Sequence, residues 1–192
     1  LVGKTEFYSL PIQVTPQCLI PRPETEQLVE TAIDFLRQRE GIQHIFEPCT
    51  GSGCISIAIA KNYPEAAIIA SDISEPALSI AEKNIEMHNL QDRIKLLKGD
   101  LYDAIIPEFE GTNFDLIISN PPYVTEDEYE NIEKNVKDYE PSQALLAGQK
   151  GLDLIIPLIE KAPSFLKTGG ALMFEIGYSQ AEDVKKLINH NE

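Results

Sequence analysis

Cysteine and histidine are scarce in this sequence, and long apolar runs are missing. The 192 residues include three cysteines, none of them in a C-x-x-C pair, and three scattered histidines. This pattern is typical of reduced thiols in the cytoplasm and does not indicate a metal site. No apolar run approaches the roughly 20 residues that a membrane-spanning helix needs. The first residues also lack the layout of a signal peptide. We therefore expect a cytoplasmic protein with no metal and no membrane partner.

Positive charge is scarce as well. Lys and Arg together number 16 against 31 Asp and Glu residues, which gives a net charge of -15. Because nucleic acids are bound largely through their phosphates, this charge argues against a nucleic-acid partner and favours a small molecule or a protein. The length suggests one domain, and 43% of the residues are hydrophobic, which is enough for a sizeable core.

Strands alternate with helices along most of the chain. Apolar, β-branched runs predict strands at residues 42–47, 66–70, 94–97, 114–119 and 171–176. Apolar periodicity predicts helices at residues 28–40, 55–60, 75–87, 151–166 and 179–188. This alternation predicts an α/β, Rossmann-like fold with a doubly wound, mainly parallel sheet.

Two segments stand apart from the alternation. Residues 6–15 predict a β-hairpin, so that residues 1–23 form a hairpin with a proline-rich linker and residues 24–192 form the main domain. The acidic stretch between residues 124 and 140 predicts a solvated loop with one short helix.

A glycine turn follows the first strand of the predicted sheet. Gly51 and Gly53 allow the backbone to approach a ligand and to aim N–H groups at it. Asp72 ends the next strand, where an acid can accept hydrogen bonds from ribose hydroxyls, and Gly99-Asp100-Leu101 follows the third strand at the same edge, where it could contact an adenine. Ser56 replaces the third glycine of the fingerprint G-x-G-x-x-G, which favours a nucleoside without pyrophosphate over a nicotinamide cofactor. The alternative is a structural turn in which Asp72 caps the next helix.

The segment Asn120-Pro121-Pro122-Tyr123 follows the fourth predicted strand. Proline stops a strand because it donates no hydrogen bond. The amide oxygen of Asn120 and the carbonyl of Pro121 can accept both hydrogens of a planar NH₂ group, and Tyr123 can lie against its face. Two such acceptors expose the nitrogen lone pair to an electrophile, so catalysis would rest on positioning and aimed dipoles.

These motifs together resemble those of the class I S-adenosylmethionine-dependent methyltransferases, and within them the HemK/PrmC family. That family methylates the side-chain nitrogen (N5) of a glutamine in peptide chain release factors. Asn-Pro-Pro-Tyr alone is shared with adenine-N6 methyltransferases. The segments at residues 21–26 and 140–152 are more particular to the HemK/PrmC family. The segments that carry the resemblance are Leu19-Ile20-Pro21-Arg22-Pro23-Glu24-Thr25-Glu26, Thr50-Gly51-Ser52-Gly53, Asp72-Ile73, Gly99-Asp100-Leu101, Asn120-Pro121-Pro122-Tyr123, and Tyr139-Glu140-Pro141…Ala144-Leu145…Gly151-Leu152.

The resemblance implies a protein-glutamine methyltransferase of translation termination, with S-adenosylmethionine as cofactor, S-adenosylhomocysteine as product and a release factor as partner. It implies that the glutamine amide binds to the catalytic residues Asn120, Pro121, Pro122 and Tyr123. It implies that residues 22–26 lie beside the cofactor. The cofactor site that it implies consists of Glu47, Cys49, Thr50, Gly51, Ser52, Gly53, Asp72, Ile73, Asp100, Leu101 and Asn120.

Several positions depart from the family pattern. Glu47-Pro48-Cys49 replaces the usual Asp-x-Gly, so Cys49 must either avoid a positive φ or accept strain. Leu101 stands where many relatives carry an aromatic residue. The helical N-terminal domain and the last two strands of the family are missing, which predicts a chain truncated at both ends. We expect a monomer.

Other functions remain open at this point. An adenine-N6 methyltransferase would have to flip its base into the Asn120 site, and the negative charge argues against it. An inactive cofactor-binding fragment is favoured by the truncation and by Cys49. Glu175, at the end of the last predicted strand, could approach the site from the same edge of the sheet, but we expect it to be a solvated acid.

Overall fold

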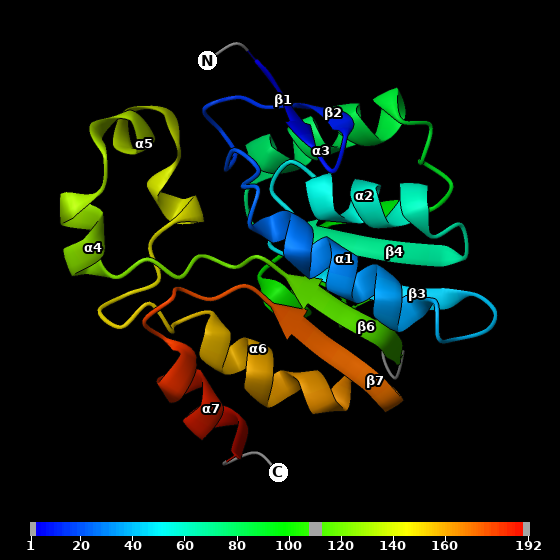
Figure 1. The fold of residues 1–192 in the computed structure, drawn as a ribbon. Coiled ribbons are helices and arrows are strands. Elements are labelled where there is room, and N and C mark those ends of the chain that lie inside the picture. Colours follow the sequence, from blue (N-terminus) through cyan, green and yellow to red (C-terminus); the bar gives the residue numbers. More distant parts are fainter. Residues whose placement is uncertain (1–2, 108–112, 190–192) are drawn as a thin grey trace.

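A five-stranded parallel sheet forms the centre of the computed structural model, which describes residues 3–107 and 113–189 (Figure 1). Its order is β5-β4-β3-β6-β7, so the strand order reverses between β3 and β6. The predicted doubly wound α/β fold is therefore confirmed, and ligands of such sheets bind at that reversal. The strands are β3 (Gln43–Pro48), β4 (Ala66–Asp72), β5 (Ile94–Lys98), β6 (Phe114–Ser119) and β7 (Leu166–Phe174).

Helices cover both faces of the sheet (Figure 1). One face packs against α1 (Thr25–Leu36), α2 (Cys54–Asn62) and α3 (Glu75–Met87). The other packs against the 3₁₀ turn η1 (Leu101–Ala104), α6 (Ile155–Lys161) and α7 (Ala181–Asn189).

Alternation along the central strands builds the two cores. On β3, Ile45 belongs to the core under α1–α3, and its neighbour Phe46 belongs to the opposite core. On β6, Leu116 and Ile118 join the first core and Ile117 the second. Successive side chains of a strand point to opposite faces, so a strand buried on both faces reads as one continuous apolar run.

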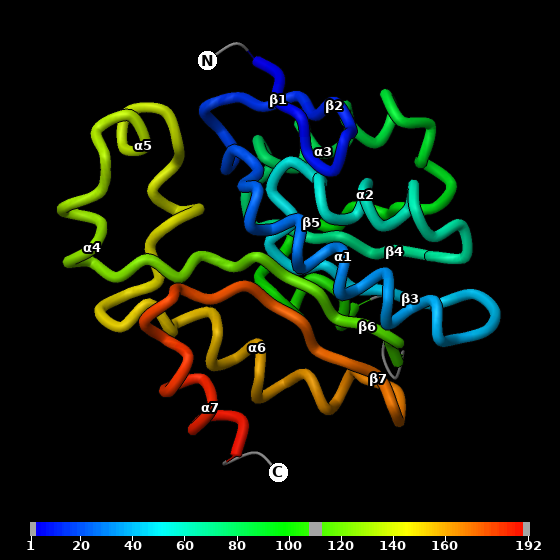
Figure 2. The backbone as a smooth tube through the Cα atoms, in the orientation of Figure 1, coloured from blue at the N-terminus to red at the C-terminus, as the bar shows by residue number. Residues whose placement is uncertain are grey.

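A short antiparallel hairpin precedes the sheet, and Figure 2 shows it at the opposite end of the molecule from α7. Its strands are β1 (Lys4–Phe7) and β2 (Leu10–Gln13), so the hairpin covers residues 4–13 rather than the predicted 6–15. The buried side chains of Phe7 and Ile12 belong to the same core as α1–α3. Asn84 of α3 accepts from the Gln13 N–H (2.8 Å) and donates to the carbonyls of Gln13 (3.0 Å) and Ser52 (2.9 Å). The hairpin is thereby connected to the glycine turn.

The structure differs from the predicted boundaries mainly near turns. Helix α1 ends at Leu36, earlier than predicted, and Gly41 adopts a positive φ (77°) in the turn before β3. Strand β7 begins at Leu166, earlier than predicted, because it pairs with β6 across a register shift: Leu166 lies opposite Phe114, but Ala171 lies opposite Leu116. Such an irregularity interrupts the alternation by which a strand is recognised.

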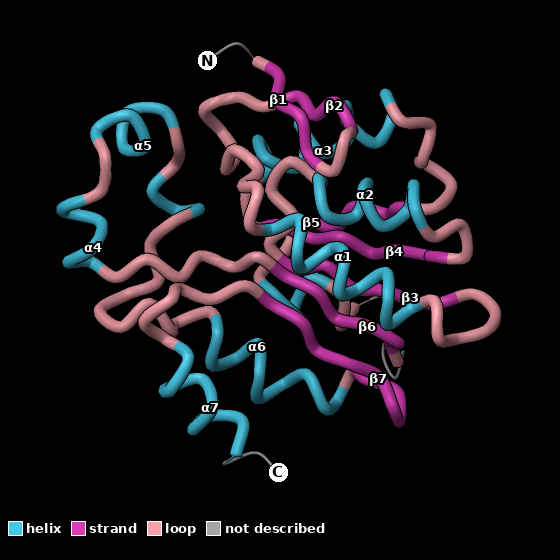
Figure 3. Tube along the Cα trace, in the orientation of Figure 1, coloured by secondary structure: helices cyan, strands magenta, loops and turns pink. Residues whose placement is uncertain are grey.

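The acidic stretch contains two short helices rather than one. They are α4 (Glu126–Asn131) and α5 (Lys134–Tyr139), and Figure 3 shows them beyond the end of the sheet. Thr125 and Glu128 form a capping box that starts α4. Neither helix has a buried residue, which confirms the predicted solvated face.

The helix predicted over residues 151–166 is shorter than expected. It is α6, and it gives way at Ala162 to a 3₁₀ turn that contains Pro163. Within the described residues, no helix combines the length and apolar character that crossing a membrane requires.

Candidate active site

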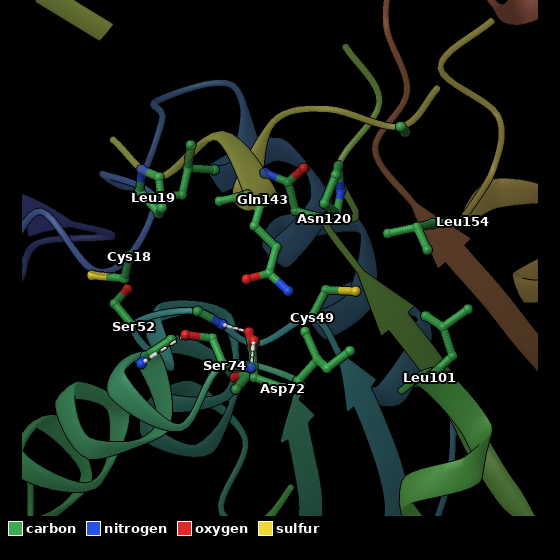
Figure 4. A pocket seen from close by; sticks show the side chains of 18 of the residues that line it. Cys18, Leu19, Cys49, Ser52, Asp72, Ser74, Leu101, Asn120, Gln143 and Leu154 are labelled. Carbon is green, nitrogen blue, oxygen red and sulfur yellow. Dashed lines mark hydrogen bonds between the residues drawn. The ribbon is translucent and has the colours of Figure 1, made fainter. Parts of the chain in front are cut away.

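A cavity of about 370 Å³ lies at the carboxyl ends of the central strands (Figure 4). Its floor is formed by the turns after β3 and β4 and by Asn120 after β6. Two segments far apart in the sequence, residues 17–25 and 141–148, form a large part of its wall, and the turn after β5 also lines it. In Figure 4 the side chain of Gln143 extends into the middle of this space.

Most of the residues that the sequence assigned to a site meet at this cavity. Two of the predicted cofactor residues, Glu47 and Gly53, and two of the predicted catalytic residues, Pro121 and Tyr123, are not part of its wall. Tyr123 lines a second, neighbouring cavity, together with Glu24 and Glu175. The predicted residues that do line the first cavity are Cys49, Thr50, Gly51, Ser52, Asp72, Ile73, Asp100, Leu101, Asn120 and Pro122.

The turn after β3 requires left-handed backbone at three positions. Gly51 (φ 55°) and Gly53 (φ 79°) adopt it readily because they have no Cβ. Cys49 also has a positive φ (60°), so of the two outcomes foreseen for this departure the strained one is found, at a cost of about 1–2 kcal/mol. Burial raises the pKa of its thiol, aided by the charge of Asp72, so the thiol remains protonated.

Asp72 holds this turn from the end of β4. One carboxylate oxygen accepts from the Gly51 N–H (2.8 Å) and the other from the Ser74 N–H (2.9 Å). The cap of α3 is the Ser74 hydroxyl, which accepts from the Ala77 N–H, so Asp72 is not the cap that the alternative interpretation required. Burial raises the pKa of Asp72, and its backbone hydrogen bonds oppose that shift.

Glu47 lies on β3 just before this turn, and its side chain is fully buried. One of its carboxylate oxygens accepts from both the N–H and the hydroxyl of Ser56, in the first turn of α2. Ser56 thus has a structural role at the position of the missing third glycine. Burial raises the pKa of Glu47 to about 8, against the lowering effect of the Ser56 hydrogen bonds.

The raised pKa of Glu47 predicts a pH-dependent stability. The folded protein holds this proton more tightly than the unfolded chain, so the contribution of Glu47 is complete below about pH 4.5 and is lost as pH rises through about 8. Urea unfolding should therefore show the wild type losing stability relative to Glu47→Gln as the pH rises. The difference in free energy of unfolding should change by about 1 kcal/mol per pH unit between about pH 5 and about pH 8. Parallel pH profiles for wild type and variant would contradict this assignment.

Asn120 belongs to a chain of hydrogen bonds at the ends of β6 and β7. Its amide nitrogen donates to the Thr25 hydroxyl (3.1 Å), which donates to one oxygen of Glu175 (2.6 Å). The other oxygen of Glu175 accepts from the Tyr123 hydroxyl (2.9 Å). The amide oxygen of Asn120 is buried and has no partner among the described residues.

Glu175 is not the solvated acid that the sequence suggested. Its carboxylate binds two side chains, and its N–H donates to the Ser119 carbonyl (3.0 Å), which fixes the end of β7 beside the end of β6. Burial and the Glu175 carboxylate both raise the pKa of Tyr123, so its phenol remains a donor.

Gln180 fixes the backbone of Tyr123. Its amide nitrogen donates to the carbonyls of Tyr123 (3.0 Å), Lys150 (3.2 Å) and Gly151 (3.0 Å), and its oxygen accepts from the Gly177 N–H (2.8 Å). A buried amide with this many partners rigidifies the backbone that it connects. Tyr123 is therefore fixed both at its ring hydroxyl and at its main chain.

An ion pair joins the two segments that enclose the cavity. The Arg22 guanidinium contacts both oxygens of Glu140 (2.6 and 2.8 Å), although the two residues lie 118 positions apart. Glu140 is buried, which corrects the expectation that the whole acidic stretch is solvated. One guanidinium nitrogen makes both contacts, and this charged, partly buried pair links the two segments.

Sequence reasoning missed three of these residues as site components. Thr25 stood within a segment that the resemblance had indicated, but without a role. Gln180 carried no signal of its own, and the side-chain partners of Glu175 lie 52 and 150 positions away from it. A strand-end acid after the last predicted strand was the one usable hint.

Comparison with known proteins places the chain in a family. The model of the methyltransferase small domain matches residues 29–138. The chain belongs to this family. The fold agrees with that placement, since the crystal structure of the SAM-dependent methyltransferase from Agrobacterium tumefaciens superposes with a TM-score of 0.66 at 15% identity, covering 89% of this chain and 50% of that one.

Curated relatives confirm the resemblance seen in the motifs. The release factor glutamine methyltransferase of Rhodopirellula baltica is 41% identical over 100% of this chain and 64% of its own length. That of Koribacter versatilis is also 41% identical, over 98% of this chain and 65% of its own length. The chain therefore spans a little under two thirds of the length of these relatives.

Proposed function

We propose that this methyltransferase transfers a methyl group from S-adenosylmethionine to the side-chain amide nitrogen of a glutamine in a peptide chain release factor. The observation that carries the proposal is the buried, unpartnered amide oxygen of Asn120 at the wall of the cavity. No described group donates to the neighbouring Pro121 carbonyl either. Two free acceptors on adjacent residues match in number the two hydrogens of an NH₂ group.

The cavity fits the cofactor through its donors and acceptors. Asp72 keeps lone pairs for ribose hydroxyls beyond its two backbone hydrogen bonds. The buried Thr50 hydroxyl, which also lines the cavity, has no hydrogen-bond partner among the residues that the structure describes. We propose that Gly51 and Ser52 contact the methionine part, and that Asp100 and Leu101 flank the adenine. When bound, S-adenosylmethionine supplies the methyl group and leaves as S-adenosylhomocysteine.

The residues of this chain contribute positioning rather than a strong base. Asn120 and the Pro121 carbonyl hold both amide hydrogens of the glutamine, which fixes the amide plane so that the nitrogen lone pair, perpendicular to that plane, faces the methyl donor. Their dipoles stabilise the positive charge that develops on nitrogen during transfer, and the extra proton then passes to solvent. Tyr123 packs beside the amide with its hydroxyl directed to Glu175.

The names of the curated relatives support glutamine in a release factor as the substrate. The acidic charge of the chain supports a protein partner over a nucleic acid. We propose further that residues 24–192 form the catalytic unit, that residues 1–23 form a supporting hairpin and linker, and that the protein acts as a cytoplasmic monomer.

Removal of the Asp72 carboxylate should weaken cofactor binding. Asp72→Ala loses both the proposed ribose contacts and the hydrogen bond that orients Gly51. Hydrogen bonds to a charged group imply a loss of at least about tenfold in affinity for S-adenosylmethionine. Isothermal titration would measure it, with Asp34→Ala, an exposed acid on α1, as the matched control. An unchanged dissociation constant would remove Asp72 from the ribose site.

The function itself is tested by incubating the protein with S-adenosylmethionine and a bacterial release factor, followed by peptide mass measurement. We expect one methyl group on a single glutamine, and none when that glutamine is replaced by asparagine. A parallel reaction with adenine-containing DNA and RNA tests the alternative substrate. Methylated adenine without methylated glutamine would replace the proposal.

A further inference from the structure

The orientation of the Asn120 amide decides which groups this site can accept. The two ends of an asparagine side chain are similar in size, but the oxygen accepts hydrogen bonds and the nitrogen donates them. With the oxygen toward the substrate, the site takes an NH₂ group. With the nitrogen toward the substrate, it takes a carboxylate or a carbonyl instead.

The direction of hydrogen bonding from Glu175 settles that orientation. A carboxylate can only accept, so the single hydroxyl proton of Thr25 points to Glu175 (2.6 Å). The Thr25 oxygen can then only accept from Asn120, whose amide nitrogen lies 3.1 Å away. The amide oxygen is left on the other side, buried and without a partner among the described residues.

Glu175 is itself held at both oxygens and at its backbone. Tyr123 donates to its second oxygen (2.9 Å), and the Ser119 carbonyl accepts from its N–H (3.0 Å). The carboxylate therefore keeps one position relative to Thr25. Thr25 is almost fully buried, so water does not compete for its hydroxyl.

We propose that Thr25 and Glu175 are positioning residues that fix the Asn120 amide with its oxygen toward the substrate, and thereby select a carboxamide over a carboxylate. This inference rests on the proposed function for its substrate. The orientation of Asn120 does not depend on that function and can be measured separately.

Two substitutions separate this role from simple packing. Thr25→Val keeps the shape of the side chain and removes both hydrogen bonds, so Asn120 loses its fixed orientation. Glu175→Gln reverses the direction of the hydrogen bonds between residues 175, 25 and 120. The new amide nitrogen can donate to the Thr25 oxygen, and the Thr25 hydroxyl then donates to Asn120. The second variant favours the wrong orientation, whereas the first favours neither.

The expected kinetic results follow that order. Thr25→Val should lower kcat for glutamine methylation about 10-fold, Glu175→Gln about 100-fold, and Thr25→Ser no more than about threefold. The double variant should match Thr25→Val rather than multiply the two losses, since Glu175 acts only through Thr25. Affinity for S-adenosylmethionine and the melting temperature should change little. Thr31→Val, whose hydroxyl binds only its own helix, is the matched control.

Nuclear magnetic resonance tests the orientation without any activity. In wild type, the Asn120 amide protons should show nuclear Overhauser effects to the Thr25 side chain, and in Glu175→Gln these should disappear. Absence of these effects in wild type, or multiplicative losses in the double variant, would overturn the inference. Failure of the proposed function would appear differently, as wild-type protein with the effects but without glutamine methylation.

Discussion

Asn120→Ala is expected to lower kcat for glutamine methylation by about 100- to 1,000-fold. The variant removes one of the two acceptors that orient the substrate nitrogen, and removal of one preorganised dipole from an active site has an effect of that size. The Pro121 carbonyl remains, so the substrate can still bind, but its lone pair is no longer held toward the methyl group. Single-turnover kinetics with saturating cofactor would measure the loss.

The fold should survive this substitution. The Asn120 side chain makes one hydrogen bond, to Thr25, and its oxygen makes none to a described residue. Asn62→Ala provides the control, because that asparagine binds only the Ala58 carbonyl of its own helix. Retention of most activity by Asn120→Ala would refute the role given to this amide and, with it, the proposed mechanism.

Gly151→Ala is expected to destabilise the protein by about 3 kcal/mol or more, the sum of left-handed backbone strain and overpacking. Gly151 has a φ of 66°, and a Cβ there would lie 2.1 Å from the Tyr123 carbonyl oxygen and 2.4 Å from the amide nitrogen of Gln180. Neither atom can move freely, because each is hydrogen-bonded to the other. The change should also lower activity, since Tyr123 would be displaced.

Gly41→Ala is the matched control for this prediction. Gly41 has a similar φ (77°), but a Cβ at that position would meet no atom within 4 Å. It should therefore cost only the backbone term, about 1 kcal/mol. Urea unfolding of both variants measures the difference, and equal losses of stability would show that the contact with Tyr123 is unimportant.

The regular parts of the fold were readable from the sequence. Residues 114–119 and 75–87 were predicted with the boundaries that β6 and α3 have, because their apolar patterns are uninterrupted and proline marks an end of each. The beginning of β7 was missed, since its first residues pair with β6 across a register shift. The second acidic helix was missed because neither helix buries an apolar face.

The site was predicted at its strand ends but not in its supports. Gly51, Asp72 and Asn120 follow strands, and the topology of a parallel sheet brings such positions together. Thr25 and Glu175 lie 150 positions apart in the sequence, and no local sequence pattern predicts a contact between residues so far apart. Physical reasoning from one sequence finds what a strand end presents, whereas side-chain partners across the fold require the structure.

The hydrogen bond between Thr25 and Glu175 also bears on the order in which the protein matures during synthesis. It joins residues 150 positions apart, whereas Asn120 and the glycine turn both precede Glu175 in the chain. A nascent chain can present the glycine turn, Asp72 and even Asn120 before Glu175 has left the ribosome, but the amide is not yet oriented. The Asn120 amide can therefore take up the orientation seen here only after strand β7 has joined the sheet beside β6.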